Sequence, residues 1–277
     1  MTPPPEHGPD VGSLVTWLFV PGDRPERFAK AASSAADAVI LDLEDAVAPA
    51  DKDHAREQVC RWLTDSGTGW VRVNAASTTW HAADVAALTA CPGLLGLVVP
   101  KAEDPQQLAE IGSRLPGGAG LVALVESAVG VHRAVDLARC AAVDRLAFGS
   151  IDFAGDIGAD GSWESLLYAR SALVLASRVG GLAPPVDGVT TAIGDPQRLA
   201  TDVAAARGLG FTGKLCIHPG QVEPVRDGFA PSADEVAWAE RVLAAVGDSE
   251  GAVAVDGAMV DRPVVERAKA ILRRRPA

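Results

Sequence analysis

Short runs of hydrophobic residues alternate with amphipathic stretches along most of the chain. Several runs are continuous in Val, Ile and Leu, which is typical of parallel strands covered on both faces. The seventh run is the weakest of the eight. We predict strands at Trp17–Pro21, Ala38–Leu43, Trp70–Asn74, Leu94–Lys101, Leu121–Glu126, Arg145–Gly149, Pro185–Thr190 and Gly213–His218.

Helical signals lie between these strands. An aspartate followed by proline, as at Asp104-Pro105 and Asp195-Pro196, is typical of an N-cap with proline at the first helical position. Residues Glu164–Val179 predict one long helix. Eight strands separated by helices favour a (β/α)₈ TIM barrel. An open doubly wound sheet is the alternative. After the second strand, one helix face is marked by Ala55, Val59, Trp62 and Leu63.

The pattern changes after the eighth strand. Ser232 and Glu235 form a capping-box pair before an amphipathic helix, residues 247–257 are a Gly- and acid-containing linker, and a final helix follows Arg262-Pro263. We therefore predict a barrel over residues 12–230 and a C-terminal helical extension over residues 231–277. The extension is expected to pack on, or complete, a neighbouring subunit's site. Residues 1–11 read as a disordered tail.

Composition and charge narrow the class of protein. The 277 residues are 48% hydrophobic and 22% charged, which is globular, and the length suits a single barrel. The 25 Lys and Arg residues against 36 Asp and Glu residues give a net charge of −11, which argues against nucleic acid and anionic membranes as partners. The cysteines, at positions 60, 91, 140 and 216, are widely separated, so we expect reduced thiols in a cytoplasmic protein. We expect neither a secretory signal nor a membrane span.

Polar residues gather where the predicted strands end. In a (β/α)₈ barrel these ends form the active-site face. Carboxylates without a cluster of histidines or cysteines favour Mg²⁺ over Zn²⁺. Any single residue has a structural alternative, since Glu126 could equally serve the start of the following helix and His218 a structural role. As a set they favour function: Asp42, Glu44, Asp45, Glu126 and Asp152, facing Arg72 and Lys101.

The segment after the first strand is a candidate anion site. Arg24, Arg27 and Lys30 cluster around the predicted start of the first helix. A helix N-terminus adds N–H groups and a dipole that favour a phosphate. An ordinary exposed helix with charges at i and i+3 is an equally good interpretation.

Seven motifs occur in order along nearly the whole chain. Each is weak alone, but together they are specific. They resemble the citrate lyase beta-subunit-like proteins of the HpcH/HpaI aldolase and malyl-CoA lyase superfamily. The motifs are LFVPGDRPERF (18–28), VILDLEDAV (39–47), VRVN (71–74), VVPKAE (98–103), ALVESAVGV (123–131), AFGSIDFAGDIG (147–158) and GKLCIHPGQV (213–222).

The resemblance implies an Mg²⁺-dependent enzyme that cleaves or forms a C–C bond in a CoA thioester of a hydroxy acid. By motif, Glu126 and Asp152 match the metal-binding carboxylates, and Arg72 matches an arginine beside the 2-oxoacid and the thioester oxygen. The residues implied to hold CoA are Phe19, Arg24 and Lys30. Those implied to support the metal waters and Arg72 are Asp42, Glu44 and Asp45.

The resemblance also implies a homo-oligomer, a trimer or hexamer, in which a C-terminal aspartate reaches the neighbouring subunit's site. The matching residue is Asp261, although it could equally be the N-cap of the helix after Pro263. Cleavage of malyl-, citramalyl- or citryl-CoA would release acetyl-CoA and a 2-oxoacid. Arg72 would stabilise the enolate, and Asp261 would exchange a proton with the acetyl methyl carbon.

Three other functions compete with this one. A CoA-independent 2-oxoacid aldolase of the same superfamily would carry a histidine directly after the strand-two glutamate, where this chain has Asp45. The beta subunit of a citrate lyase complex would act on an acyl-carrier thioester. A non-catalytic binding subunit would not need Glu126, Asp152 and Arg72 together. The acyl group, the stereochemistry, the physiological direction and the oligomer size are not determined by the sequence.

Overall fold

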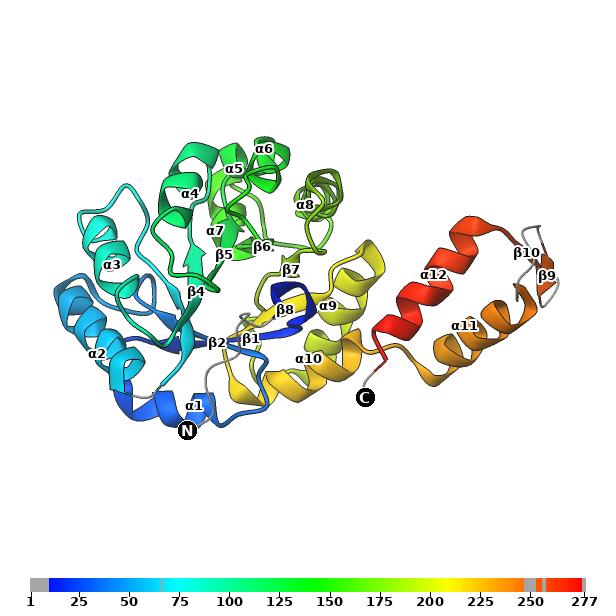
Figure 1. Cartoon of the computed structure of the whole chain (residues 1–277), viewed down its shortest axis with the longest axis horizontal. Coiled ribbons are helices and arrows are strands. Elements are labelled where there is room, and N and C mark those ends of the chain that lie inside the picture. The colour runs from blue at the N-terminus through cyan, green and yellow to red at the C-terminus, as the bar shows by residue number, and fades with distance from the viewer. Residues whose placement is uncertain (1–9, 66, 247–252, 256–257, 276–277) are drawn as a thin grey trace. The chain divides into compact units, whose positions relative to one another are not determined.

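A closed barrel of eight parallel strands forms the larger part of the molecule (Figure 1). The computed structural model describes residues 10–65, 67–246, 253–255 and 258–275. Each strand pairs with its neighbours in chain order and β1 pairs with β8, so the predicted (β/α)₈ fold is confirmed. The strands are β1 (Thr16–Pro21), β2 (Ala38–Asp42), β3 (Gly69–Arg72), β4 (Leu94–Val99), β5 (Gly120–Val125), β6 (Arg145–Phe148), β7 (Val186–Asp187) and β8 (Gly213–Cys216).

Helices surround the barrel on its outer side (Figure 1). The predicted Asp-Pro helix starts are confirmed at Asp104 and Asp195, whose side chains accept hydrogen bonds from backbone N–H groups of the following turn. The helices are α1 (Phe28–Ala32), α2 (Lys52–Asp65), α3 (His81–Leu88), α4 (Pro105–Gly112), α5 (Ala128–His132), α6 (Ala134–Ala138), α7 (Ser150–Ile157), α8 (Leu167–Gly180), α9 (Pro196–Leu209) and α10 (Val222–Phe229). Short 3-10 helices cover Val11–Ser13, Pro25–Arg27, Pro49–Asp51 and Pro219–Gln221.

All eight predicted strands are present, but most end before the predicted polar residues. After β4 the chain reaches Lys101, whose φ of 48° lies in the left-handed region and cannot continue a strand. The predicted long helix also starts later, at Leu167, because residues 163–166 form a turn. Asp42 and Arg72 are therefore the last residues of β2 and β3, Asp152 lies in α7, and Glu44, Asp45, Lys101 and Glu126 lie in loops at the rim of the barrel.

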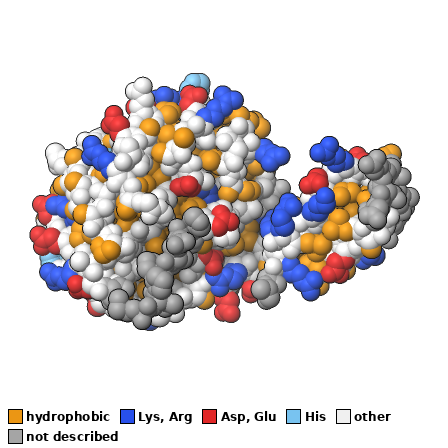
Figure 2. Space-filling view, in the orientation of Figure 1, with side chains coloured by type: hydrophobic (Ala, Val, Ile, Leu, Met, Phe, Trp, Pro, Cys, Tyr) orange, Lys and Arg blue, Asp and Glu red, His pale blue; other side chains and the backbone are white. Residues whose placement is uncertain are grey.

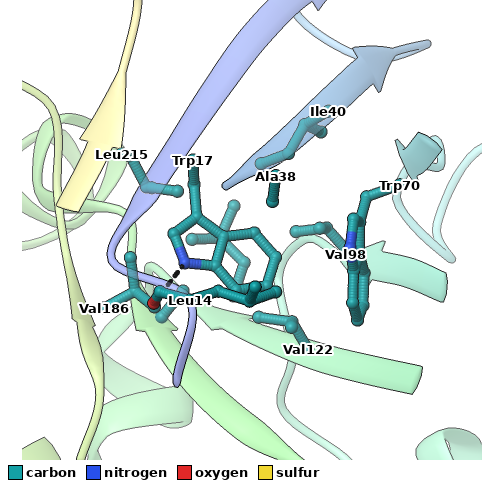
Figure 3. Packing of buried hydrophobic residues seen from close by; sticks show 11 residues of the cluster. Leu14, Trp17, Ala38, Ile40, Trp70, Val98, Val122, Val186 and Leu215 are labelled. Carbon is teal, nitrogen blue, oxygen red and sulfur yellow. Dashed lines mark hydrogen bonds between the residues drawn. The ribbon is translucent and has the colours of Figure 1, made fainter. Parts of the chain in front are cut away.

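The barrel interior is filled by hydrophobic side chains at its N-terminal end (Figure 3). The indoles of Trp17 and Trp70 meet edge to face, with ring centroids 5.1 Å apart. The Trp17 Nε1 atom donates to the Leu14 carbonyl oxygen at 3.2 Å. Since side chains alternate across a strand, the residue two positions beyond each core residue faces inward at the next level. This alternation places Arg72 above Trp70, and Glu126 above Leu124.

The chain divides into two compact units, residues 1–226 and residues 227–277. The second contains α11 (Ala233–Val246), α12 (Arg262–Arg273) and a hairpin of β9 (Val253–Val255) and β10 (Ala258–Val260). The predicted capping box is confirmed, because Ser232 N donates to Glu235 Oε2 and Glu235 N donates to Ser232 Oγ. Helices α11 and α12 enclose a small hydrophobic cluster around Val242 and Ile271.

Two predicted irregular segments fall partly outside the described residues. Of the predicted tail, residues 1–9 lie outside them, whereas Asp10 caps the 3-10 helix that starts at Val11. Of the predicted linker, only 253–255 are described, as β9. Within the described chain, no helix is long and apolar enough to cross a bilayer. On the barrel face shown in Figure 2, acidic and basic side chains are scattered among hydrophobic ones.

Candidate active site

Arg72 is clamped by a carboxylate at the end of the neighbouring strand. Its Nε and Nη2 atoms donate to Oδ1 and Oδ2 of Asp42, each at 2.7 Å. The register pairs these two residues across β2 and β3. Asp42 also accepts the backbone N–H groups of Glu44 and Ala46, at 2.9 and 3.1 Å. A two-pronged contact of this kind fixes the plane of the guanidinium as well as its position.

The remaining nitrogen of Arg72 faces two further carboxylates. Nη1 donates to Asp45 Oδ2 at 3.2 Å and lies 3.0 Å from Glu44 Oε2. The ring of Phe19 covers the guanidinium carbon at 4.8 Å. Burial alone would lower the pKa of Arg72, but the three carboxylates raise it above its ordinary value. Arg72 is therefore a permanent positive charge in a fixed orientation.

Glu44 is held in an unusual environment. Its Oε2 atom is buried without a hydrogen-bond partner, although Arg72 lies at ion-pair distance. Burial raises the pKa of Glu44 to about 8, Arg72 opposes this, and the nearby carboxylates of Glu126, Asp45 and Asp42 add to it. Glu44 thus holds its proton more strongly than an ordinary glutamate, which the sequence did not indicate.

A second group forms around Lys101. The backbone N–H of Lys101 donates to Glu126 Oε1 at 2.8 Å, and its ammonium contacts Asp152 and lies 3.6 Å from Glu126 Oε1. Lys101 has the left-handed backbone noted above, which directs both groups at the two carboxylates. Burial raises the pKa of Glu126 to about 7 despite the opposing effects of Lys101 and Arg72. The helix after Glu126 is capped by Ser127, so Glu126 is not needed as a cap.

One cavity of about 440 Å³ joins the two groups. Six of the predicted site residues line it: Phe19, Asp42, Asp45, Arg72, Glu126 and Asp152. Its other walls are largely apolar, including Leu124, Phe148, Val189, Leu215 and Ile217. A mostly apolar cavity with a few converging charged groups is typical of a small-molecule site.

Lys52 supports this site and was missed by the sequence analysis. Its ammonium is buried and donates to the carbonyl oxygens of Leu43 and Glu44, at 2.7 and 2.6 Å. These bonds hold the turn that carries Glu44 and Asp45. A signal was present, because Lys52 begins α2, where the helix dipole disfavours a positive charge.

The predicted phosphate site after β1 has exposed cations. Arg24 lies 3.8 Å from Asp23, and Arg27 lies 3.9 Å from Glu26. Lys30 is exposed on α1, which has five residues. None of these cations is among the residues that line the 440 Å³ cavity.

Three other polar residues make structural contacts. His218 Nδ1 accepts the Gly220 N–H at 3.0 Å, and the Asn74 amide donates to buried Asp84 at 2.7 Å. Asp261 belongs to the C-terminal unit, where it is exposed and Oδ1 accepts the Val264 N–H at 3.3 Å. Asp261 is therefore the N-cap of α12, as the structural interpretation of the sequence expected.

The donor set fits a hard divalent cation. Within the described residues, no group of three or more His, Cys, Asp or Glu side chains could enclose a metal ion. Glu126 and Asp152 both contact the Lys101 ammonium, so their oxygens already converge on one positive charge. Mg²⁺ is commonly bound by one or two carboxylates, with water and substrate supplying the remaining ligands. A pair of carboxylates is therefore sufficient for Mg²⁺, because water and substrate supply its other ligands.

Comparison with known proteins gives one consistent result. Residues 16–219 match the family model described as HpcH/HpaI aldolase/citrate lyase. A citrate lyase subunit beta-like protein of Mycobacterium tuberculosis (strain CDC 1551 / Oshkosh) is 41% identical over 266 residues, covering 93% of this chain and 94% of that protein. The mitochondrial citramalyl-CoA lyase of Homo sapiens is 31% identical over 281 residues, covering 91% and 82%.

A solved structure is similar over the same extent. It is the protein CitE from Mycobacterium tuberculosis in complex with magnesium, acetoacetate and coenzyme A. The TM-score is 0.83 at 38% sequence identity, and the match covers 95% of this chain and 99% of that one.

Proposed function

The chain belongs to the HpcH/HpaI aldolase/citrate lyase family, and from this premise we propose that it is an Mg²⁺-dependent carbon–carbon lyase of the oxo-acid-lyase type. Its substrate is a 3-hydroxyacyl-CoA thioester such as malyl-, citramalyl- or citryl-CoA, which it cleaves to acetyl-CoA and a 2-oxoacid. The observation that carries the proposal is a single cavity lined by the clamped Arg72 and the Glu126–Asp152 pair. A relative that is a citramalyl-CoA lyase, and a similar structure with magnesium and coenzyme A, support it.

Glu126 and Asp152 would hold the Mg²⁺ ion. When bound, the ion supplies Lewis-acid polarisation of the 2-oxoacid carbonyl. The Lys101 ammonium contacts the same carboxylates, so it would share them with the ion. The backbone bond from Lys101 to Glu126 Oε1 does not depend on that ammonium and keeps Glu126 in position.

Arg72 would stabilise the negative charge that develops during cleavage. The bond between the hydroxyl-bearing carbon and the thioester α-carbon breaks, and its electron pair becomes the enolate of acetyl-CoA. A fixed guanidinium aimed at the enolate oxygen lowers this barrier without reorganisation. Asp42 and Asp45 hold Arg72 in one plane, and Phe19 covers one side of it.

Two protons must also move. The substrate hydroxyl loses its proton as the carbonyl forms, and the enolate carbon gains one to become the acetyl methyl group. We assign the second transfer to Asp261 of a neighbouring subunit, because the family resemblance places an aspartate there. Asp261 is exposed in this chain, and its capping bond leaves the second carboxylate oxygen available.

Phe19, Arg24 and Lys30 would hold the CoA portion. Phe19 lines the cavity, and Arg24 and Lys30 follow it on the same segment with exposed cationic ends. CoA carries phosphates, so exposed cations on the segment that follows Phe19 suit it despite the net charge of −11.

We also propose that the enzyme is a homo-oligomer, a trimer or hexamer, that works in the cytoplasm. Exposed hydrophobic side chains follow one another along α8, namely Leu167, Tyr168, Leu175 and Val179. An apolar stripe of this kind supports an interface between copies. All four cysteines are free thiols, which supports a reducing compartment.

Product analysis by mass spectrometry tests the proposed function. The purified protein is incubated with Mg²⁺ and malyl-, citramalyl- or citryl-CoA, and acetyl-CoA is quantified. We expect release from at least one thioester that disappears with EDTA and in Glu126→Ala. Glu57→Gln, at an exposed position on α2, is the matched control and should behave as wild type. Release of no acetyl-CoA from all three would contradict the proposal and direct the test to carrier-protein thioesters or free 2-oxoacids.

A further inference from the structure

The proposed cleavage requires a base at the substrate hydroxyl. As the carbon–carbon bond breaks, this hydroxyl becomes a carbonyl and gives up its proton. Asp261 serves the other proton transfer, in which the enolate carbon gains a proton. A different group must therefore accept the hydroxyl proton, and it must line the cavity that holds the reacting atoms.

Four carboxylates line the 440 Å³ cavity, namely Asp42, Asp45, Glu126 and Asp152. Each oxygen of Asp42 already accepts two hydrogen bonds, one from Arg72 and one from a backbone N–H group. Glu126 and Asp152 are assigned to the metal ion. Among the described residues that line the cavity there is no histidine or cysteine. Of the four carboxylates, Asp45 is therefore the one available as a base.

Asp45 combines a fixed backbone with an open side chain. The residues on either side of it, Glu44 and Ala46, donate their backbone N–H groups to the Asp42 carboxylate at 2.9 and 3.1 Å. Lys52 Nζ donates to the Glu44 carbonyl oxygen, directly before Asp45, at 2.6 Å. The Asp45 side chain is 61% exposed, so a proton accepted there can pass to water after each turnover.

The two carboxylate oxygens of Asp45 have different surroundings. Oδ2 accepts a hydrogen bond from Arg72 Nη1 at 3.2 Å, which holds the carboxylate beside the guanidinium. Within the described part of the chain, Oδ1 takes part in no hydrogen bond, so it is free to accept a proton. Glu44 also faces Arg72 Nη1, but it is only 7% exposed and does not line the cavity.

The position beside Arg72 suits the order of atoms in the substrate. In a 3-hydroxyacyl thioester, one carbon separates the hydroxyl-bearing carbon from the thioester carbonyl. Because Arg72 faces the thioester oxygen in the proposed mechanism, the hydroxyl lies close to the guanidinium. A general base must be within hydrogen-bond reach of the proton that it accepts, and Asp45 is the neighbour of Arg72 that meets this condition from the cavity wall.

We propose that Asp45 is a further catalytic residue, the general base that accepts the proton of the substrate hydroxyl. The inference rests on the proposed lyase activity. The O–H bond breaks and its electron pair forms the carbonyl, while the pair of the broken carbon–carbon bond becomes the enolate. Asp45 gains the hydroxyl proton, and Asp261 gives a proton to the enolate carbon. Both residues then return to their starting states by proton exchange with water.

Asp45→Asn tests the assignment with little change in shape. The amide oxygen can still accept the hydrogen bond from Arg72, but the side chain no longer accepts a proton. On the thioester that wild type cleaves, kcat should fall by about a hundredfold, whereas KM should change by less than about threefold. Asp51→Asn is the matched control and should keep both values, because Asp51 is exposed on the next 3-10 helix and does not line the cavity.

A partial reaction distinguishes a base from a support for Arg72. The enzyme is incubated in deuterium oxide with Mg²⁺, acetyl-CoA and oxalate, which stands in for the 2-oxoacid but does not condense. Exchange of the acetyl methyl hydrogens requires the enolate but no substrate hydroxyl. Mass spectrometry should show exchange by Asp45→Asn within about threefold of wild type, whereas Arg72→Met should lose it.

Added formate gives a second readout. Asp45→Ala leaves space for a small carboxylate at an exposed position, so formate can act as the base in solution. It should raise the turnover of Asp45→Ala by at least about tenfold, whereas sodium chloride at the same ionic strength should not. A variant that had only lost a structural contact would not respond to a free base.

The outcomes separate the base from the lyase activity. If wild type releases acetyl-CoA from no thioester, the lyase proposal fails and the base fails with it. If wild type is active, a kcat of Asp45→Asn within about tenfold of wild type overturns the base alone, as does an equal loss of cleavage and methyl exchange. A larger loss of kcat in Glu44→Gln than in Asp45→Asn would also overturn it. Loss of cleavage with retained exchange, and rescue of Asp45→Ala by formate, support it.

Discussion

Two buried arginines at opposite ends of the barrel show how differently the two ends are built. At the N-terminal end, the guanidinium of Arg145 donates to the carbonyl oxygens of Val11, Leu14 and Pro184, at 2.6–2.9 Å. At the C-terminal end, Arg72 faces three carboxylates. Burial lowers the pKa of Arg145 to about 10, whereas the carboxylates raise that of Arg72.

The difference separates stability from chemistry. Arg145 ties the N-terminal segment to the bottom of the barrel through hydrogen bonds to the backbone carbonyl groups of Val11, Leu14 and Pro184. Arg72 lies in a site with five carboxylates, two of which, in Glu44 and Glu126, have raised pKa values. Such crowding costs folding stability and is typical of an active site.

The largest effect is expected from removing the arginine of the catalytic end. Arg72→Met should lower kcat by about a thousandfold, because a preorganised charge at the enolate oxygen is lost. The enzyme should still bind Mg²⁺, because Glu126 and Asp152 are unchanged, and titration calorimetry can verify this. A variant that keeps turnover within about tenfold of wild type would show that Arg72 does not stabilise the transition state.

Asp261→Asn should lower turnover by about a hundredfold while Mg²⁺ and CoA binding persist, since only the proton transfer is removed. The amide still accepts the Val264 N–H, so α12 keeps its cap. Mixing this variant with Arg72→Met under subunit exchange should restore activity, because mixed oligomers contain some complete sites. Normal turnover by Asp261→Asn would show that Asp261 does not transfer the proton and serves only as the N-cap of α12.

Removing the arginine of the other end should affect stability instead. Arg145→Met removes the arginine's hydrogen bonds to three carbonyl groups and to the Thr212 hydroxyl, and should lower the free energy of unfolding by about 4 kcal/mol. Well below the melting temperature, kcat should stay within about twofold of wild type. Chemical denaturation with a parallel activity assay measures both. A fall in kcat comparable to that of Arg72→Met would contradict the assignment of Arg145 to stability and Arg72 to catalysis.

A smaller change in folding stability is expected when the pH is varied. The folded-state pKa of Glu126 is about 7, above its ordinary value of 4.5, so the folded protein binds the extra proton. The contribution of this carboxyl to the free energy of unfolding is fully present below pH 4.5. It is lost as the pH rises through 7, by roughly 3 kcal/mol in total. In EDTA, stability should therefore fall between pH 5 and pH 8, and thermal unfolding reports it.

Glu126→Gln is the control for that titration, because its amide cannot lose a proton. Its pH profile should be flatter than that of wild type over the same interval. Glu44, whose pKa is about 8, titrates in the same direction and accounts for the slope that remains. Identical slopes for wild type and Glu126→Gln would show that Glu126 is ordinarily ionised in the folded protein.

Much of this architecture could be predicted because its signals are local. The Asp-Pro helix starts at Asp104 and Asp195, and the Ser232–Glu235 capping box, depend on residues three or fewer positions apart. Alternation along a strand decides that Arg72 and Glu126 face inward, as Trp70 and Leu124 do below them. Knowing the fold, one can therefore assign these side chains to the active-site end.

Other features depend on contacts between distant segments. The division of the five carboxylates into a set around Arg72 and a pair around Lys101 follows from how the loops meet after closure of the barrel. Lys52 lies in a helix among other charged residues, and only its buried contacts with Leu43 and Glu44 reveal its role. The buried ion pairs of Asp187 with Arg170 and Lys214 likewise depend on contacts between α8, β7 and β8.

The sequence alone therefore determined the eight strands, several helix starts, the family and the inward-facing chemical groups, because periodicity, capping and motifs are properties of neighbouring residues. Only the tertiary structure decided which carboxylates share a cation and which of them have raised pKa values. Those properties depend on burial and on distances of a few ångströms between segments far apart in the chain, and electrostatic energies change steeply with both.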